Sequence, residues 1–202
     1  MKENTRLLRY LIQKKCILFS KRGFTSKWGD HFSFETDIRP AFLTMSDSKK
    51  SARLIYERIR KAIPSFDGFI GVPETGTLLA FFLNIEHARN VSADIPVNML
   101  RSKPKLYQGV TAYSVQPLSK KARFVLIEDD VVTGKTLRTY AKTLHTLGIK
   151  HLQIVSIIDR LQKDRHGRTV QRQMKEDFGY RYHTLITLDD IQSELPKRGY
   201  ES

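Results

Sequence analysis

Three consecutive acids and a glycine turn a few residues later are the part of this 202-residue chain best suited to chemistry. Residues 124–127 form a short apolar run of branched and aromatic side chains, which is typical of a buried parallel strand. Glu128, Asp129 and Asp130 follow it directly, and the segment after residue 136 has apolar residues at helical spacing. The acids are therefore expected at the carboxyl end of a strand, the edge at which open parallel sheets bind ligands.

The turn between the acids and the predicted helix has the composition of a phosphate site. Residues 133–136 read Thr-Gly-Lys-Thr, and a glycine turn at the start of a helix offers several backbone N–H groups to one anion. Asp129 and Asp130 would repel each other unless hydroxyl groups or a divalent cation relieve the repulsion. A ribose 5-phosphate has this layout, with hydroxyls at one end and a phosphate at the other. The spacing disfavours the alternative of a solvated strand-to-helix loop.

The same turn matches the end of the ATP-binding loop of NTPases, but not its beginning. That motif requires a glycine five residues before Gly134, and Asp129 stands there instead. Because the carboxylate of Asp129 would repel the phosphates, an NTPase is disfavoured.

Five segments together resemble the type I phosphoribosyltransferases, and most of all the orotate phosphoribosyltransferases. The strand, the acids and the turn at residues 124–137 resemble the family's phosphoribosyl diphosphate signature, and residues 67–80 resemble its diphosphate-binding loop. Residues 24–29 resemble a Phe-Thr-Leu-Lys-Ser-Gly segment near the N-terminus, while the Asp-Arg pair at 159–160 and the segment 185–191 resemble those that close the domain. The resemblance implies an α/β fold with a central parallel sheet flanked by helices and a small N-terminal hood.

The order of apolar segments agrees with that fold. Strand candidates recur with room for a crossover helix between them, at residues 69–72, 95–100, 124–127, 152–158 and 182–186. Residues 46–63 form an amphipathic helix, and residues 17–34 alternate as in a hairpin around residues 27–30. The length suits one core with an appendage. We therefore expect a hood at residues 1–45 and a phosphoribosyltransferase core at residues 46–202.

Composition limits the environment and the partners. The net charge of +14 suits anionic substrates, or else a nucleic acid, which we consider possible but do not favour because the basic cluster near residues 160–175 has few aromatic residues. Cys16 has no second cysteine with which to pair, and basic residues interrupt the N-terminal apolar positions, so no signal peptide or membrane span is predicted. A cytoplasmic protein is expected, with a mitochondrial transit peptide at residues 1–24 as the alternative.

The resemblance implies a Mg²⁺-dependent transfer of ribose 5-phosphate from phosphoribosyl diphosphate to orotate. Asp129, Asp130 and Lys105 would be catalytic, and Mg²⁺ would be held mainly by the substrate diphosphate, with Asp129 and Asp130 acting through water. The implied binding residues for phosphoribosyl diphosphate are Glu74, Thr75, Gly76, Arg101, Lys103, Lys105, Tyr107, Asp129, Asp130, Val131, Val132, Thr133, Gly134, Lys135, Thr136 and Leu137. Those for orotate are Lys27, Phe34, Thr133 and Arg160.

Residues 101–109 are expected to form a mobile basic loop that folds over the diphosphate, in the family often in the partner subunit's site, so a homodimer is expected. The segment departs from the orotate pattern: Ser102 replaces a lysine, Lys103 a glutamate and Tyr107 a histidine. A local shift would let Lys103 substitute for the missing lysine. A changed substrate or reduced activity is the alternative.

Two other functions stay open. A hypoxanthine/guanine phosphoribosyltransferase shares the Glu-Asp and Thr-Gly-Lys-Thr elements, but purine enzymes carry an aspartate as general base where this chain has Val132. A nonenzymatic relative would sense phosphoribosyl diphosphate and bind a nucleic acid or a protein. Residues 161–177, rich in Arg, Lys and Gln, have no predicted function and are expected to form an exposed helix.

Overall fold

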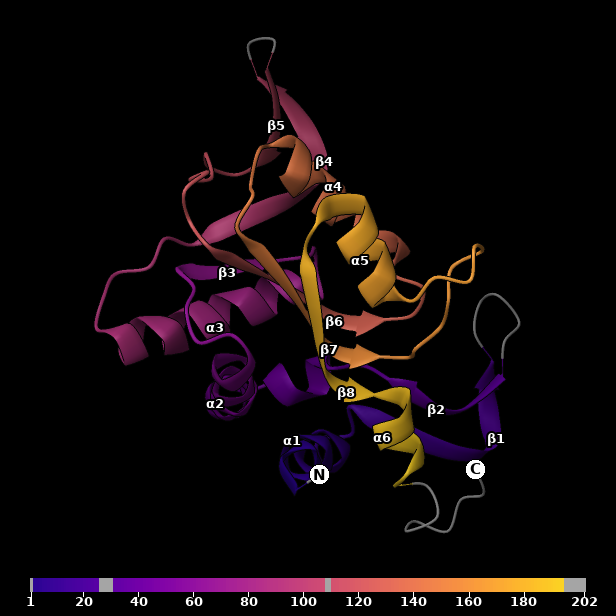
Figure 1. Cartoon of the computed structure of the whole chain (residues 1–202). Coiled ribbons are helices and arrows are strands. Elements are labelled where there is room, and N and C mark those ends of the chain that lie inside the picture. Colours follow the sequence, from indigo (N-terminus) through magenta and orange to yellow (C-terminus); the bar gives the residue numbers. More distant parts are fainter. Residues whose placement is uncertain (1, 26–30, 108–109, 195–202) are drawn as a thin grey trace.

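The computed structural model describes residues 2–25, 31–107 and 110–194. Its centre is a six-stranded sheet of order β5-β4-β3-β6-β7-β8, and the hairpin β1-β2 forms a second, separate sheet (Figure 1). The strands are β1 (Ile17–Thr25), β2 (His31–Thr36), β3 (Gly68–Gly71), β4 (Asn98–Tyr107), β5 (Val110–Ser114), β6 (Phe124–Val131), β7 (Leu152–Asp159) and β8 (Arg181–Thr187). The helices are α1 (Lys2–Gln13), η1 (Arg39–Phe42), α2 (Met45–Ala62), α3 (Thr75–Val91), α4 (Lys135–Thr146), α5 (Val170–Phe178) and α6 (Leu188–Gln192).

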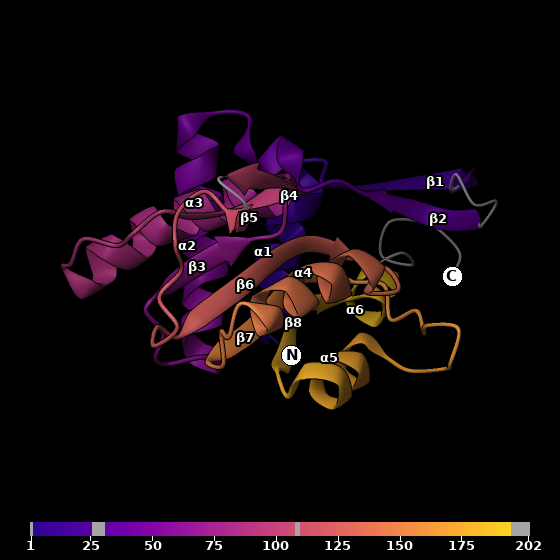
Figure 2. The same ribbon diagram turned by 90° about the horizontal axis from the view of Figure 1, so that it is seen from above.

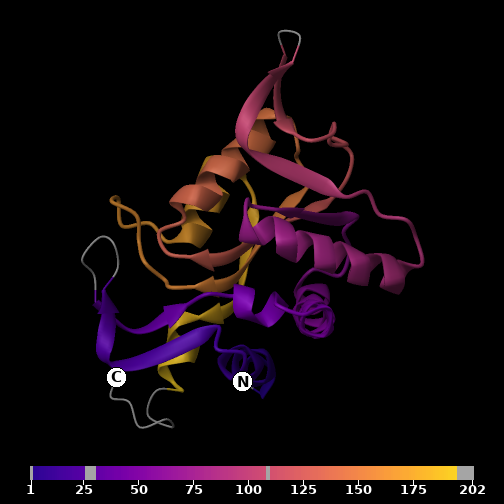
Figure 3. The same cartoon turned by 180° about the vertical axis from the view of Figure 1, so that it is seen from behind.

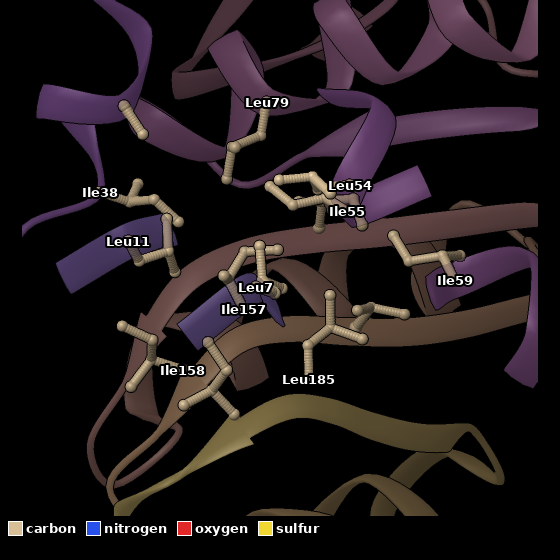
Figure 4. Packing of buried hydrophobic residues seen from close by; sticks show 14 of the residues in the cluster. Leu7, Leu11, Ile38, Leu54, Ile55, Ile59, Leu79, Ile157, Ile158 and Leu185 are labelled. Carbon is tan, nitrogen blue, oxygen red and sulfur yellow. The ribbon is translucent and has the colours of Figure 1, made fainter. Parts of the chain in front are cut away.

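Different helices cover the two faces of the large sheet. Side chains alternate along a strand, so Val125 and Ile127 of β6 pack in one core cluster with residues of α1, α2 and α3. Leu126, between them, packs in a second cluster with residues of α4 and α5. Figure 4 shows the first cluster from close by, and Figure 3 shows the fold from behind. The predicted α/β fold, a mostly parallel sheet between two layers of helices, is confirmed.

The N-terminal segment contributes both to the core and to a projection. Leu7 and Leu11 of α1 are buried in the first cluster together with Leu185 of β8 (Figure 4). The hairpin β1-β2 projects from one side of the molecule (Figure 2), with Phe19 opposite Phe34. The predicted hairpin is therefore present, while its turn at residues 26–30 lies outside the described residues. The division of the chain at residue 45 stays a prediction.

The predicted helix at residues 46–63 is α2, which begins after Thr44. The Thr44 side chain accepts a hydrogen bond from the Asp47 N–H at 3.1 Å, as an N-cap residue does. The predicted strands at 69–72, 124–127, 152–158 and 182–186 correspond to β3, β6, β7 and β8. In the described part of the chain, none of the helices is long and apolar enough to cross a membrane.

The expectation of a basic loop after residue 100 was wrong. β4 continues to Tyr107 and pairs antiparallel with β5, with Lys105 opposite Ala112. The pairing is irregular between Leu100 and Lys105. The cations and Pro104 had suggested a loop, but a second strand satisfies the backbone groups of the segment and makes it a two-stranded ribbon.

Candidate functional site

The predicted site residues gather where β3, β6 and β7 reach their carboxyl ends. Gly71, the last residue of β3, is opposite Ile127 of β6, and Val131, the last residue of β6, is opposite Asp159 of β7. The connections that follow these strands therefore start at one edge of the sheet. A cavity of about 120 Å³ lies there, lined by Glu128, Asp130, Val131, Val132, Thr133, Gly134, Lys135, Thr136 and Leu137.

The turn at residues 131–137, which we call the phosphate turn, has the geometry of an anion site. Gly134 precedes α4 with a φ of +76°, the left-handed region that glycine adopts without strain. No side chain caps this end of α4. The first N–H groups of a helix have no partner within it, and the helix dipole favours negative charge beside them. The phosphate turn can therefore bind a phosphate through its backbone.

Glu128 differs from the other two acids because it is buried. Its side chain is 7% exposed, and burial raises the pKa of its carboxyl to about 9, an effect to which a hydrogen bond and like charge from Asp129 add. Glu128 is therefore neutral at pH 7 although it lines the cavity. Asp129 is half-buried and is not among the residues that line this cavity.

Asp130 is joined to two residues from other elements. Arg160, directly after β7, donates from Nη2 to Asp130 Oδ2 at 2.6 Å. The Thr36 hydroxyl, at the end of β2, donates to the same oxygen at 2.6 Å and accepts from Arg160 Nη2 at 2.6 Å. Arg160 and Asp130 side chains are only 13% and 20% exposed. This cluster connects the N-terminal hairpin to the carboxyl ends of β6 and β7.

The residues predicted for orotate are partly brought together. The Phe34 ring is buried, and the Arg160 guanidinium carbon lies 5.9 Å from its centroid, a cation–π distance. Thr133 lines the cavity next to Asp130. Lys27 lies outside the described residues. The structure therefore brings Phe34 and Arg160 together, and it also pairs Arg160 with Asp130, which was predicted for the sugar.

The predicted diphosphate-binding loop follows β3. Glu74 is exposed, Thr75 begins α3, and the peptide bond between Pro73 and Glu74 is cis. A Cβ atom on Gly76 would lie 2.5 Å from the carbonyl oxygen of Ile127. Only glycine therefore allows this loop to approach β6 so closely, and the loop reaches the same edge of the sheet as the three acids.

The basic residues predicted to meet the diphosphate lie on the β4-β5 ribbon. Lys103 and Lys105 are exposed, while Arg101 is half-buried and donates from Nε to the Ser114 carbonyl at 3.2 Å. The side chain of Tyr107 lies outside the described part. Figure 1 shows the ribbon extending from the sheet on the side away from the β1-β2 hairpin. The structure thus separates this ribbon from the cluster around Arg160.

Sequence reasoning missed residues that hold Arg160 in place. Asp159, 4% exposed, accepts hydrogen bonds from the Tyr182 hydroxyl at 2.7 Å and from the Leu161 N–H at 2.8 Å. Burial raises the pKa of Asp159, and these hydrogen bonds oppose the shift. Asp159 therefore fixes the turn that carries Arg160. Thr36 was also missed, although its position two residues after Phe34 on a strand places both on one face.

The carboxylates do not form a complete metal site on their own. Within residues 2–25, 31–107 and 110–194, no group of three or more His, Cys, Asp or Glu side chains could hold a metal ion. Asp129 and Asp130 are nevertheless hard oxygen donors at the ligand edge. Mg²⁺ commonly uses one or two carboxylates together with water and substrate phosphates, so the residues fit a Mg²⁺ ion that arrives with a diphosphate.

Comparisons with known proteins agree with this geometry. No family model matches the sequence. The orotate phosphoribosyltransferase of Pyrococcus furiosus is 29% identical over 191 residues, and that of Pyrococcus abyssi is 27% identical over 191 residues; each alignment covers 95% of both chains. A hypoxanthine/guanine phosphoribosyltransferase of Methanosarcina barkeri is 27% identical over 124 residues, 56% of this chain and 61% of its own.

Solved structures share the fold at lower identity. The orotate phosphoribosyltransferase of Francisella tularensis superposes with a TM-score of 0.74 at 18% identity, covering 98% of this chain and 92% of its own. That of Aeropyrum pernix has a TM-score of 0.71 at 19% identity, covering 97% of this chain and 99% of its own.

Proposed function

The chain belongs to the type I phosphoribosyltransferases, and we propose that it transfers ribose 5-phosphate from phosphoribosyl diphosphate to orotate, giving orotidine 5′-phosphate and diphosphate in pyrimidine synthesis. The observation that carries this proposal is the extent of the likeness. The orotate enzymes align with 191 of the 202 residues, so the likeness must include much of residues 1–45. The purine enzyme aligns with only 56% of the chain.

Phosphoribosyl diphosphate would bind along the edge formed by β3 and β6. We assign its 5-phosphate to the phosphate turn, whose N–H groups can surround one anion. The ribose hydroxyls are assigned to Asp129 and Asp130, and the diphosphate to Glu74, Thr75 and Gly76 with cations of the β4-β5 ribbon. Mg²⁺ would neutralise the departing diphosphate. Burial of Glu128 as a neutral acid keeps a third negative charge out of this anion site.

Orotate would bind on the other side of the ribose, with its polar groups toward Thr133, Arg160 and Lys27 and its ring near Phe34. Arg160 suits this task because a guanidinium can bind a carboxylate through two parallel hydrogen bonds. Asp130 holds that guanidinium in the structure. We therefore propose that orotate and Asp130 exchange as partners of Arg160. The partner exchange would leave Asp130 able to accept from the ribose.

The reaction breaks the bond between C1 of the ribose and the diphosphate oxygen, which leaves with the electron pair. A ring nitrogen of orotate supplies the pair for the new C1–N bond and releases its proton, which the departing diphosphate can accept. The transition state resembles an oxocarbenium ion, so negative charge from Asp129 and Asp130 beside the sugar and alignment of both reactants lower the barrier. Val132 occupies the place of the general base of purine enzymes, which favours an orotate substrate.

The proposal includes a homodimer in the cytoplasm. Lys103 and Lys105 extend from the body on the β4-β5 ribbon, a suitable place for reaching a second subunit. On α3, Leu78, Phe81 and Ile85 are each 38–44% exposed, and their spacing places them on one face of the helix. Such an exposed apolar face is typical of an association surface. Sedimentation of the purified protein tests the dimer.

The decisive experiment is a Mg²⁺-dependent assay with phosphoribosyl diphosphate and orotate, following the loss of orotate absorbance, with uracil, hypoxanthine and guanine in parallel. Asp129→Asn serves as the inactive control against a contaminating host enzyme. Asp94→Asn makes the same chemical change at an exposed position outside the site and should keep full activity. Turnover of a purine instead of orotate would identify a purine enzyme. Binding of phosphoribosyl diphosphate without turnover of any base would identify a regulator.

A further inference from the structure

Residues 161–177 are a long basic segment to which the proposed function gives no role. In the structure they form a connection and then α5, which buries Val170, Gln173 and Met174. The expectation of a simply exposed helix was therefore wrong, because one face of α5 packs on the second core cluster. Gln173 is 2% exposed, and a buried amide must find hydrogen-bond partners in the protein.

The partners of Gln173 connect α5 to the phosphate turn. Its Nε2 donates to the carbonyl oxygen of Thr133 at 3.1 Å and to that of Arg168 at 3.2 Å. Val170 of the same helix also faces the turn, since a Cβ atom on Gly134 would lie 3.0 Å from Val170 Cγ2. Two side chains of α5 therefore contact the turn, and neither of them lines the cavity at the ligand edge.

The hydrogen bond to Thr133 determines where an N–H group points. In a trans peptide unit, the C=O of one residue and the N–H of the next point in opposite directions. Because Gln173 holds the Thr133 carbonyl toward α5, the N–H of Gly134 must point away from α5. A phosphate bound in the turn needs such an N–H in place before it arrives, since donors oriented in advance need no reorganisation.

Ion pairs hold α5 itself in place. Arg168 donates to Asp164 at 3.0 Å and to Asp177 of α5 at 2.9 Å. Arg138 of α4 donates to Asp177 at 2.6 Å. Asp177 thus joins α4, α5 and the connection before α5. Much of the charge in this segment is neutralised locally, which offers less of it to an outside partner.

We infer that α5 and its connection position the phosphate turn, with Gln173 as the positioning residue that orients the Thr133–Gly134 peptide for phosphate binding. The inference rests on the assignment of the 5-phosphate to this turn. It gives Gln173 no contact with the substrate. Its consequence is that a residue 40 positions after Thr133 controls affinity for the phosphate end of the substrate but not for the base.

The test compares Gln173→Met with its neighbour Met174→Ala. Gln173→Met keeps the length of the side chain and removes its donor, whereas Met174→Ala opens a cavity in the same helix and leaves the hydrogen bond to the Thr133 carbonyl in place. Binding of ribose 5-phosphate, measured by calorimetry, is the first readout because it does not depend on turnover. KM values for phosphoribosyl diphosphate and for orotate are the second.

We expect Gln173→Met to weaken ribose 5-phosphate about tenfold and to raise KM for phosphoribosyl diphosphate similarly, with KM for orotate changed less than about twofold. Met174→Ala should lower Tm by about 5 °C or more with unchanged phosphate affinity. Unchanged affinity in Gln173→Met, or an equal loss in Met174→Ala, overturns the inference. Should methionine pack poorly, Gln173→Leu removes the same donor. If the wild-type protein binds ribose 5-phosphate but does not turn over orotate, the proposed function is refuted and the inference about Gln173 is not.

Discussion

The phosphate end of the site is formed by one chain segment, whereas the base end is formed by side chains from three segments. The phosphate turn is one continuous segment, 131–137, and α5 holds it through an amide-to-carbonyl hydrogen bond and an apolar contact. The base end combines three segments, with Phe34 and Thr36 from the hairpin, Asp130 from β6 and Arg160 from the residue after β7. An ion pair between side chains holds it together.

This difference has a consequence for binding. Backbone N–H groups keep their direction whether or not an anion is present, so the phosphate end is ready for its ligand. At the base end, Arg160 already has Asp130 as its partner, and under the proposed function an anionic base would replace Asp130. Removing only one member of a partly buried pair is unfavourable, whereas exchanging one carboxylate for another conserves the interaction. The phosphate end should therefore tolerate fewer backbone changes, and the base end fewer charge changes.

The largest effect is expected where the two ends meet. Asp129→Asn with Asp130→Asn keeps the size of both side chains and removes the charge near C1, so we expect turnover to fall at least about 100-fold. Steady-state assays with orotate measure this loss. Asp94→Asn, exposed and outside the site, is the matched control. Turnover of the double variant within about tenfold of the wild type would show that these acids do not stabilise the transition state.

A change in the backbone of the phosphate turn should affect the phosphate end of the site more than the base end. Gly134→Ala requires a Cβ at a φ of +76° and 3.0 Å from Val170 Cγ2. We expect KM for phosphoribosyl diphosphate to rise about 10- to 100-fold and the free energy of unfolding to fall about 1–3 kcal/mol.

Gly148→Ala is the control for this strain. Gly148 has a φ of +81°, but an added Cβ would meet only the Lys120 side chain, at 3.5 Å. Gly148→Ala should lower the free energy of unfolding by a comparable amount and leave KM for phosphoribosyl diphosphate unchanged. If both variants raise KM equally, general destabilisation explains the effect and the phosphate turn has no special requirement.

The contrast between the ends also explains what could be predicted from the sequence. The acids, Gly134 and the helix after them are neighbours in the chain, so their types and spacing predicted β6, the turn and α4. The cluster of Thr36, Asp130 and Arg160 depends on how the hairpin lies against β6. No local pattern specifies that placement, so both charged residues were assigned to substrates and their ion pair was missed.

The β4-β5 ribbon and the buried face of α5 were missed for a related reason. Lysines and a proline made β4 look like a loop, because its strand character depends on pairing with β5, a strand that the sequence did not reveal. The buried face of α5 includes the polar Gln173, whose burial makes sense only once the Thr133 carbonyl is known to lie beside it. In both places a tertiary partner outweighed the local composition.

Removing the positive charge at the base end should weaken the binding of orotate selectively. Arg160→Ala is expected to raise KM for orotate about 10- to 30-fold, the value of a charge-assisted pair, and to change KM for phosphoribosyl diphosphate less than about threefold. Arg53→Ala, which removes an exposed guanidinium paired with Glu57, is the control and should change neither. Equal losses for the two substrates would assign Arg160 a structural role.

The last expected effect is on stability instead of turnover, and it concerns Glu128, the buried acid between the two ends. Burial gives Glu128 a folded-state pKa of about 9, well above the ordinary value of about 4.5 for a glutamate. The folded state therefore binds a proton that the unfolded state has lost between about pH 4.5 and 9, and the free energy of unfolding should fall as pH rises through that window, by at most about 1.4 kcal/mol per pH unit from this group. Glu128→Gln keeps a neutral side chain at every pH and should reduce the decrease of the unfolding free energy with pH.

Urea denaturation from pH 5 to 8.5 measures this pH dependence. Glu57→Gln, which changes an acid in an exposed pair with Arg53, is the control. Equal slopes in the wild type and Glu128→Gln would mean that Glu128 is ionised in the folded protein, and the phosphate end would then bind its anion beside a third negative charge.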